Sequence, residues 1–191
     1  MARAFAEIAF TPSVRAIQEQ QGSANAYAKF LSADLDGGDT LSVREASFIA
    51  QRDGFYQATV SETGWPYVQF RGGPRGFLKA LDGKTLAYAD FRGNRQYLSV
   101  GNLSQEERIA LILMDYPNQR RLKIWGRAVV TDISHDPELV KQLHDPAYPA
   151  RPERAITITV EAFDWNCPSH IPQRFTLEEL EMIQEDADAK S

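Results

Sequence analysis

The sequence has one cysteine, Cys167, among 191 residues, and it has no long hydrophobic run. A single thiol excludes an internal disulfide and any metal site built from several thiolates. No apolar stretch reaches the roughly 18 residues that a membrane-spanning helix needs. The first residues carry an arginine and a glutamate where a signal peptide would be apolar, so we expect a cytoplasmic protein with no membrane contact.

The sequence also lacks the common catalytic motifs. It contains no Gly-x-Ser-x-Gly, no His-Glu-x-x-His, no phosphate-loop lysine motif and no Gly-x-Gly-x-x-Gly. Its histidines, His135, His144 and His170, are too dispersed for a zinc site, and Cys167 three residues before His170 is a weak thiolate pair. We therefore expect no metal and assign no catalytic residue. The chain either uses the chemistry of a cofactor or only binds a ligand.

Charge is distributed unevenly along the chain. The formal net charge is −5, which argues against a general polyanion binder, and no aromatic-basic repeat indicates nucleic-acid binding. Residues 71–127, however, hold eleven Lys and Arg against five Asp and Glu, a net of +6. This basic segment favours a compact anionic ligand such as a phosphate. The alternative is that its arginines are solvated residues at strand edges.

The first 50 residues have helical patterns. Thr11-Pro12 and Gly22 are typical of the start and end of a helix, and Ser42 with Glu45 forms a capping box. The acidic segment 34–39, with Glu45 after it, is similar to a calcium loop, but its other ligand positions are wrong and we favour a plain loop.

Beyond residue 50 the hydrophobic period changes to that of strands. Six or seven short strands joined by tight turns predict an antiparallel barrel or sandwich. We expect an N-terminal helical extension (1–50), a barrel (51–175) and an acidic C-terminal helix with a tail (176–191). The predicted strands are 55–60, 67–71, 77–81, 85–89, 109–114, 121–130 and 155–163, and the predicted helices are 94–100, 136–143 and 176–188.

The segment 90–96 is the strongest candidate for binding. Gly93 lets backbone N–H groups approach a ligand, Asn94 can cap a helix that ends at Gly101-Asn102, and Arg95 supplies a forked cation. Together they predict a phosphate site at a helix N-terminus. The alternative is a capped loop with a solvent-exposed arginine.

Two strands add polar side chains at alternate positions. Gln69 and Arg71 share one face, with Phe70 on the other, and Arg121 and Lys123 share a face of their own strand. These faces bind an oxyanion-rich ligand or point outward to water. The loop 164–175, which contains Trp165 and Arg174, either covers a planar ring or plugs the end of the barrel.

Four segments together carry a family resemblance: 55–74, 89–97, Met114-Asp115-Tyr116-Pro117 and 163–168. In these segments the chain resembles the pyridoxamine 5′-phosphate oxidase-related, FMN-binding split-barrel proteins. The resemblance implies a mainly β (α+β) fold, a six-stranded antiparallel split β-barrel with peripheral helices. It also implies a homodimer with FMN at the subunit interface.

The resemblance further implies roles for individual residues. Arg71 with Leu78-Lys79 would hold the flavin, residues 94–96 would bind its phosphate, and Arg121 would face its ring or ribityl chain. The loop with Trp165 and Arg174 would reach the flavin from the partner subunit. The expected cofactor-binding residues are Gln69, Phe70, Arg71, Lys79, Phe91, Asn94, Arg95, Gln96, Arg121, Lys123, Trp165 and Arg174.

The chain departs from the oxidase itself in one respect. The C-terminal Arg-x-His pattern that binds pyridoxal phosphate is absent, and Arg174-Phe175 stands nearby instead. We therefore expect an FMN-dependent oxidoreductase acting on a small molecule that the sequence does not identify. The alternative is a flavin or haem carrier without turnover on the same fold.

Overall fold

The computed structural model describes residues 3–32, 37–165 and 168–188. Cys167, the acidic residues Asp34 and Asp36 of the calcium-like segment, and the tail beyond Asp188 lie outside these described residues.

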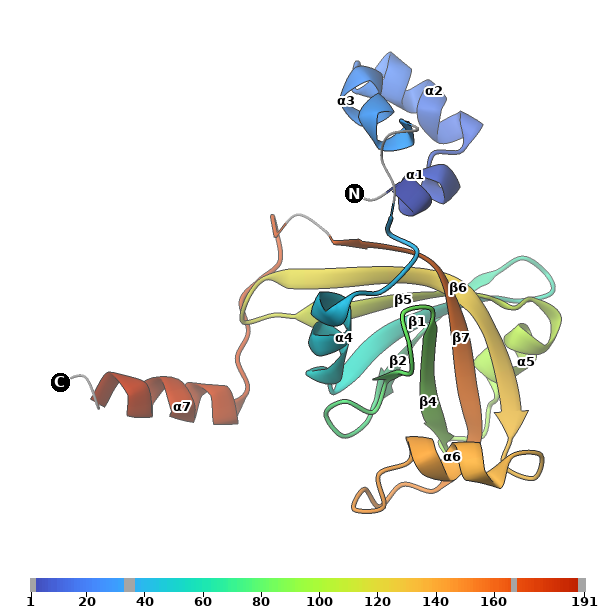
Figure 1. Ribbon diagram of the computed structural model, residues 1–191, viewed down its shortest axis with the longest axis vertical. Helices are drawn as coiled ribbons and strands as arrows, with labels where there is room; N and C mark the ends of the chain where they lie inside the picture. The colour runs from blue at the N-terminus through green and yellow to red at the C-terminus, as the bar shows by residue number, and fades with distance from the viewer. Residues whose placement is uncertain (1–2, 33–36, 166–167, 189–191) are drawn as a thin grey trace.

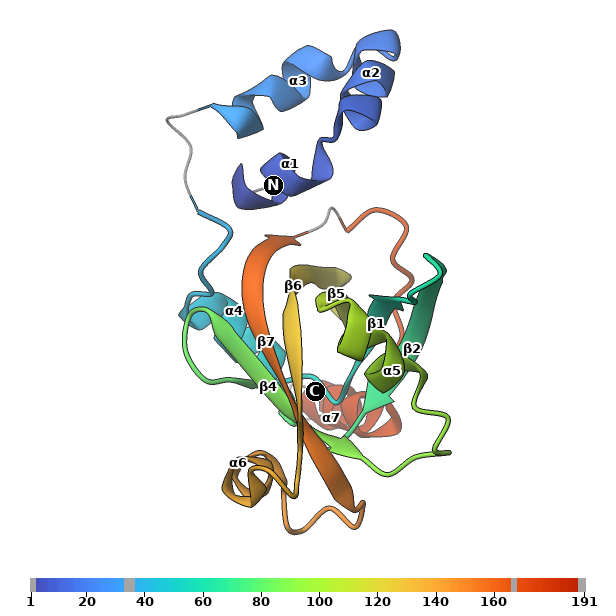
Figure 2. The ribbon, with the colours of Figure 1, turned by 90° about the vertical axis from the view of Figure 1, so that its right-hand side faces the viewer.

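The described chain forms one antiparallel sheet that curls into an open barrel (Figures 1 and 2). Its strand order is β2-β1-β5-β6-β7-β4-β3, so β2 and β3 are the two edges. The predicted split barrel is confirmed. The seventh strand is the two-residue β3. The strands are β1 (Gly54–Val60), β2 (Pro66–Gly72), β3 (Lys79–Ala80), β4 (Thr85–Phe91), β5 (Arg108–Asp115), β6 (Arg120–Asp132) and β7 (Pro152–Trp165).

Helices lie around the barrel rather than between its strands (Figure 1). Thr11 caps α2 and Ser42 with Glu45 caps α4, as the sequence predicts. No described helix is both long and apolar enough to cross a membrane. The helices are α1 (Arg3–Ala9), α2 (Pro12–Gln20), α3 (Ala24–Ala28), the 3-10 turn η1 (Lys29–Leu31), α4 (Val43–Ala50), α5 (Leu98–Gln105), α6 (Pro137–Leu143) and α7 (Leu177–Asp188).

The core fills the inside of the barrel with alternate strand residues. On β6, Leu122 and Ile124 are fully buried, while the alternating Arg121 and Lys123 point to the outer face of the sheet. Helix α4 contributes to the same core through its buried Phe48 and Ile49. Aliphatic and aromatic side chains therefore pack between α4 and the strands, and this burial is the main stabilising contribution to the barrel.

Two predicted elements were placed wrongly. The helix expected at 94–100 is α5, which begins at Leu98 and continues through Gly101 to Gln105. Arg95 and Tyr97 have φ values of 63° and 55°, a left-handed conformation that breaks a helical path before Leu98. The strand expected at 77–81 is only β3, since Phe77 turns inward and is buried in the core before the strand begins.

Helix α1 covers part of the outer face of the sheet. The ring of Phe5 stacks on Trp125 of β6, with a centroid distance of 4.4 Å and an interplanar angle of 22°. Lys123 lies 4.2 Å from the centroid of Phe5, and Ala6 is completely buried. The N-terminal extension is therefore packed against β6.

Candidate functional site

The open seam of the barrel is bridged by a buried ion pair. Arg71 on the edge strand β2 donates a hydrogen bond of 2.6 Å to Oδ1 of Asp90 on β4. Arg154 on β7 donates to the other oxygen, Oδ2, at 3.1 Å. Asp90 is 3% exposed, so its carboxylate holds two guanidinium groups in place beneath the seam.

This cluster keeps an excess of positive charge in a poorly solvated position. Burial acts most strongly, against the charged form of Arg154, but the hydrogen bond and charge of Asp90, together with Tyr97 and Glu153, outweigh it and raise the pKa of the Arg154 guanidinium. Nε of Arg71 is buried and has no hydrogen-bond partner. A buried donor without an acceptor is unfavourable, and an anionic ligand would supply the missing acceptor.

The loop between β4 and α5 forms the rim of the same pocket. Asn94 accepts a hydrogen bond of 3.1 Å from the backbone N–H of Gln96 through Oδ1. Asn94 thus caps a turn, and the residue at the start of α5 is Tyr97, so the expected helix cap by Asn94 was wrong. A Cβ on Gly93 would meet no atom within 4 Å, which leaves this stretch of backbone open to a ligand.

Side chains on α5 fix the rim to the barrel. Ser99 donates a hydrogen bond of 2.9 Å to Oε1 of Gln69 on β2, and Asn102 donates one of 3.0 Å to the hydroxyl of Thr59 on β1. The Tyr97 ring lies 4.8 Å from the guanidinium carbon of Arg154. These contacts hold the α5 end of the loop to the barrel.

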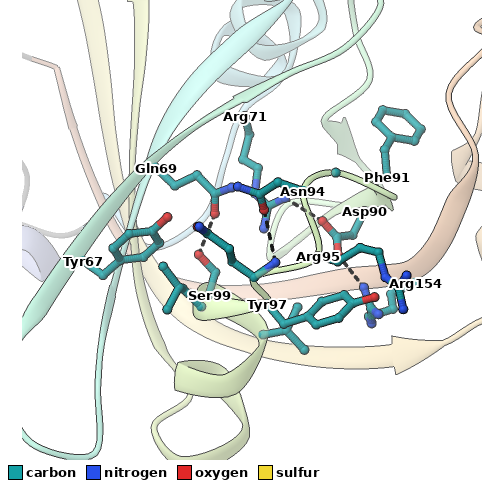
Figure 3. Close-up of a pocket in the computed structure, with 14 residues that line it drawn as sticks. Tyr67, Gln69, Arg71, Asp90, Phe91, Asn94, Arg95, Tyr97, Ser99 and Arg154 are labelled. Atoms are coloured by element: carbon teal, nitrogen blue, oxygen red, sulfur yellow. Dashed lines mark hydrogen bonds and ion pairs between the residues drawn. The ribbon is translucent and has the colours of Figure 1, made fainter.

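These residues enclose a small pocket of about 60 Å³ (Figure 3). Arg71, Arg95 and Arg154 against Asp90 give its lining a formal charge of +2. The volume is far below the roughly 300–1,000 Å³ of a site that encloses a drug-sized ligand. The pocket therefore suits one anionic end of a ligand. It is lined by Tyr67, Gln69, Arg71, Asp90, Phe91, Gly93, Asn94, Arg95, Gln96, Tyr97, Leu98, Ser99, Val100 and Arg154.

The structure brings half of the predicted site residues into this pocket. They are Gln69, Arg71, Phe91, Asn94, Arg95 and Gln96. The sequence analysis missed Arg154 and Tyr97 as site residues, and it did not give Asp90 a role. Asp90 and Tyr97 flank the segment already singled out, so they could have been included. Arg154 could not, because only the pairing of β7 with β4 places it opposite Asp90.

The other predicted residues lie outside the pocket within one chain. Phe70 is on the outer face, where its ring contacts Tyr56 with a centroid distance of 5.5 Å. Lys79 lies on the edge strand β3. Lys123 forms an ion pair of 3.3 Å with Asp164, and Arg121 on the same face has a buried Nε without a hydrogen-bond partner.

Trp165 packs within its own chain. Its Nε1 donates a hydrogen bond of 2.7 Å to Oε1 of Glu45, whose side chain also caps α4. Its ring contacts Phe48 edge-on, and the guanidinium carbons of Arg44 and Arg120 lie 4.7 and 4.9 Å from its centroid. Burial opposes ionisation of Glu45, but the hydrogen bonds from Ser42 and Trp165 together lower the pKa of this carboxyl.

Arg174 lies in a separate part of the surface, 5.1 Å from the ring centroid of Tyr116. It lines a hollow of about 330 Å³ together with Arg52, Arg75 and the start of α7. No group of three His, Cys, Asp or Glu side chains within the described ranges is placed to hold a metal ion.

Comparison with known proteins identifies the family to which this fold is related. A family model described as pyridoxamine 5′-phosphate oxidase matches residues 44–165, well over half of the chain. A search of curated proteins found no match.

Two solved structures share the fold. A HupZ variant from Group A Streptococcus superimposes with a TM-score of 0.54 at 17% identity, covering 65% of this chain and 98% of that chain. A putative pyridoxamine 5′-phosphate oxidase from Lactobacillus delbrueckii superimposes with a TM-score of 0.51 at 20% identity, covering 66% and 94%. At these identities the likeness establishes the fold alone.

Proposed function

The chain belongs to the pyridoxamine 5′-phosphate oxidase family, and from this premise we propose that it binds FMN and acts as an oxidoreductase. The observation that carries the proposal is the pocket at the barrel seam, where Arg71 and Arg154 bind one carboxylate and Arg95 lines the rim. FMN has a phosphate monoester at the end of a flexible chain. That dianion suits a small pocket with a charge of +2.

The residues present fit such a phosphate. Arg71 has a buried Nε without an acceptor, and Arg95 extends its guanidinium from the rim loop. The exposed backbone around Gly93 offers N–H groups without a side chain in the way. Charge-assisted hydrogen bonds from these groups would hold the phosphate and exclude neutral ligands.

The small pocket leaves the flavin ring outside it, and we propose that a second copy of the chain completes the site. In this arrangement the partner copy contributes residues that lie away from the pocket within one chain. These are Arg121 and Lys123 of the outer face and Arg174 of the loop after β7, with Trp165 holding that loop in position through Glu45. The homodimer thus explains why the predicted residues fall into separate groups.

Bound FMN would accept and release a hydride or single electrons. The protein would bind and orient it, and Arg121 or Lys123 beside the ring would stabilise negative charge on the reduced form. We assign no acid or base to the chain. Vitamin B6 is not proposed as the substrate because the Arg-x-His pattern is absent.

The proposal is tested by flavin titration followed by turnover. We expect the purified protein to bind FMN, seen as a change in the flavin absorbance bands, and to bind riboflavin much more weakly. Equal affinity for FMN and riboflavin would remove the phosphate pocket from the proposal.

Oxidation of NADH or NADPH with bound FMN distinguishes an oxidoreductase from a carrier, and binding without turnover across electron donors favours the carrier. Haem binding in place of flavin would contradict the cofactor assignment.

A further inference from the structure

A hollow of about 330 Å³ lies between the end of α4, the end of β5 and the arm that leads to α7. It is several times larger than the phosphate pocket, and its volume falls in the range of roughly 300–1,000 Å³ that is typical of small-molecule sites. We call it the arginine hollow, because Arg52, Arg75 and Arg174 line it from three separate segments of the chain. Of these three residues, the proposed function uses only Arg174.

The arm before α7 forms a fixed wall of the arginine hollow. Gln119 donates a hydrogen bond of 2.7 Å to the carbonyl oxygen of Ile171, and Gln173 donates one of 2.9 Å to the carbonyl oxygen of Pro117. Both contacts tie residues 168–176 to the turn between β5 and β6 (Figure 1). The arginine of this arm is therefore held beside the end of β5.

Arg52 is held in place by several contacts to the barrel. Its Nε donates a hydrogen bond of 3.3 Å to the carbonyl oxygen of Phe48, and its Nη1 donates one of 3.2 Å to the carbonyl oxygen of Met114. Nη1 also lies 3.6 Å from Oδ1 of the buried Asp115. The guanidinium thus has a fixed position, and its side chain is 15% exposed.

Positive charges gather around Arg52. Burial lowers the pKa of its guanidinium, and the nearby cations Arg75 and Arg120 lower it further. The carboxylates of Asp115 and Asp53 offset only part of this effect. The surroundings therefore disfavour the charged form of Arg52, and a bound anion would relieve the repulsion among these cations.

Two of the carboxylates in the hollow are already hydrogen-bonded within the chain. Asp115 accepts hydrogen bonds of 2.9 and 3.1 Å from Nδ2 of Asn118. Glu179 accepts hydrogen bonds of 2.8 and 3.1 Å from the backbone N–H and the hydroxyl of Thr176, at the start of α7. With Asp53, these carboxylates formally balance the three arginines. The hollow therefore selects a ligand by its available hydrogen-bond donors and not by net charge.

The available donors are those of Arg75 and Arg174. Both side chains are exposed, and neither forms an ion pair with another described residue. A guanidinium presents its N–H groups as a fork that matches the two oxygens of a carboxylate. The ring centroid of Tyr116 lies 5.1 Å from Arg174, and Phe175, the next residue along the arm, is 42% exposed. A guanidinium fork beside two aromatic rings suits a ligand with a carboxylate on a planar ring.

We propose that the arginine hollow binds a small aromatic carboxylic acid, with its carboxylate on Arg75 and Arg174 and its ring against Tyr116 and Phe175. This inference rests on the proposed function and deepens it, because the proposed function brings Arg174 to the flavin of the second copy. A molecule held by Arg174 would lie beside that flavin, so we assign small aromatic carboxylic acids as the substrate class. The acid and the phosphate of FMN have separate sites, since the two linings share no residue.

Benzoate and benzamide test the site in the full-length protein without FMN. The two molecules have nearly the same shape, and only benzoate carries a charge. We expect benzoate to bind at least about tenfold more tightly than benzamide in isothermal titration calorimetry, because benzamide forms no charge-assisted pair with a guanidinium. Failure of benzoate to bind, or equal affinity for the two molecules, would overturn the inference.

A matched pair of variants locates the bound benzoate. Arg75→Gln removes a guanidinium from the hollow, and Arg151→Gln removes an exposed guanidinium that does not line it. We expect Arg75→Gln to weaken benzoate binding at least about tenfold and Arg151→Gln to change it little. Equal dissociation constants for the two variants would contradict the assignment to the hollow. FMN titration of the same variants tests the proposed function separately, since neither residue lines the phosphate pocket.

The absorbance spectrum of bound FMN tests the assignment of the acid as substrate. We expect saturating benzoate to shift the flavin bands of the wild type, and to shift them much less in Arg75→Gln at the same concentration. Benzoate that binds without changing the flavin spectrum would separate the hollow from the flavin and overturn this assignment.

Discussion

Arg71 and Asp90 form an ion pair of 2.6 Å between an edge strand and a strand on the far side of the barrel opening. The described strands β2 and β3 share no backbone hydrogen bonds, so side chains make this connection. Arg154 completes the cluster from β7. The same groups that join the two sides of the barrel thus form the floor of the candidate phosphate site.

Replacing Asp90 with Asn should destabilise the protein strongly, because two guanidinium groups lose their shared counter-charge in a buried position. We expect a loss of about 3–5 kcal/mol in the free energy of unfolding, measured by urea denaturation. Inorganic phosphate should restore more stability to this variant than to the wild type, since it replaces the missing anion. Glu62→Gln, on an exposed turn, is the control. A variant as stable as the wild type would show that the cluster contributes nothing to folding.

Replacing Arg95 with Asn should weaken FMN binding and leave riboflavin binding unchanged. Asn tolerates the left-handed backbone at this position, where φ is 63°. The loss of a charge-assisted bond predicts about 1.5–3 kcal/mol of FMN affinity, measured by flavin titration. Arg92→Asn removes the same charge from the same loop but lies outside the pocket lining, so it is the matched control. Equal effects of the two variants would indicate a general charge effect.

The contact between Glu45 and Trp165 predicts a dependence of stability on pH. The folded state lowers the pKa of Glu45 below its ordinary value of 4.5. The carboxylate therefore contributes stability above pH 4.5, and this contribution is lost as the pH falls through the lowered pKa. In Glu45→Gln the free energy of unfolding should fall less between neutral pH and pH 3, as measured by unfolding at each pH.

Trp165→Phe separates the hydrogen bond from the packing of the ring. It keeps an aromatic ring beside Phe48 and removes the Nε1 donor. We expect a loss of about 1–3 kcal/mol at neutral pH that shrinks under acid conditions. A loss that is independent of pH would assign the effect to packing alone.

Two glycine substitutions should have opposite effects. A Cβ on Gly126 would collide with the carbonyl oxygen of Thr159, so Gly126→Ala should destabilise the barrel at the bulge between β6 and β7. A Cβ on Gly101 would meet nothing within 4 Å, and this residue lies inside α5. Gly101→Ala should therefore stabilise the protein by about 0.5–1 kcal/mol. Thermal or urea unfolding measures both changes, and destabilisation by Gly101→Ala would contradict the course of α5.

The sequence predicts those parts of the fold that depend on local patterns. The alternation of Arg121 and Lys123 with buried leucine and isoleucine, and the capping box of Glu45, depend on near neighbours and were confirmed. The start of α5 was missed because it depends on two left-handed residues that are not glycine. Arg154 was missed because its role arises from strand pairing across more than 60 positions of the chain.

The barrel opening also has a mechanical consequence. Ion pairs and side-chain hydrogen bonds hold the two margins of the opening together. The margins can therefore separate slightly while all backbone hydrogen bonds between neighbouring strands stay intact. These few polar contacts can therefore break at the margin of the phosphate pocket without local unfolding of the sheet.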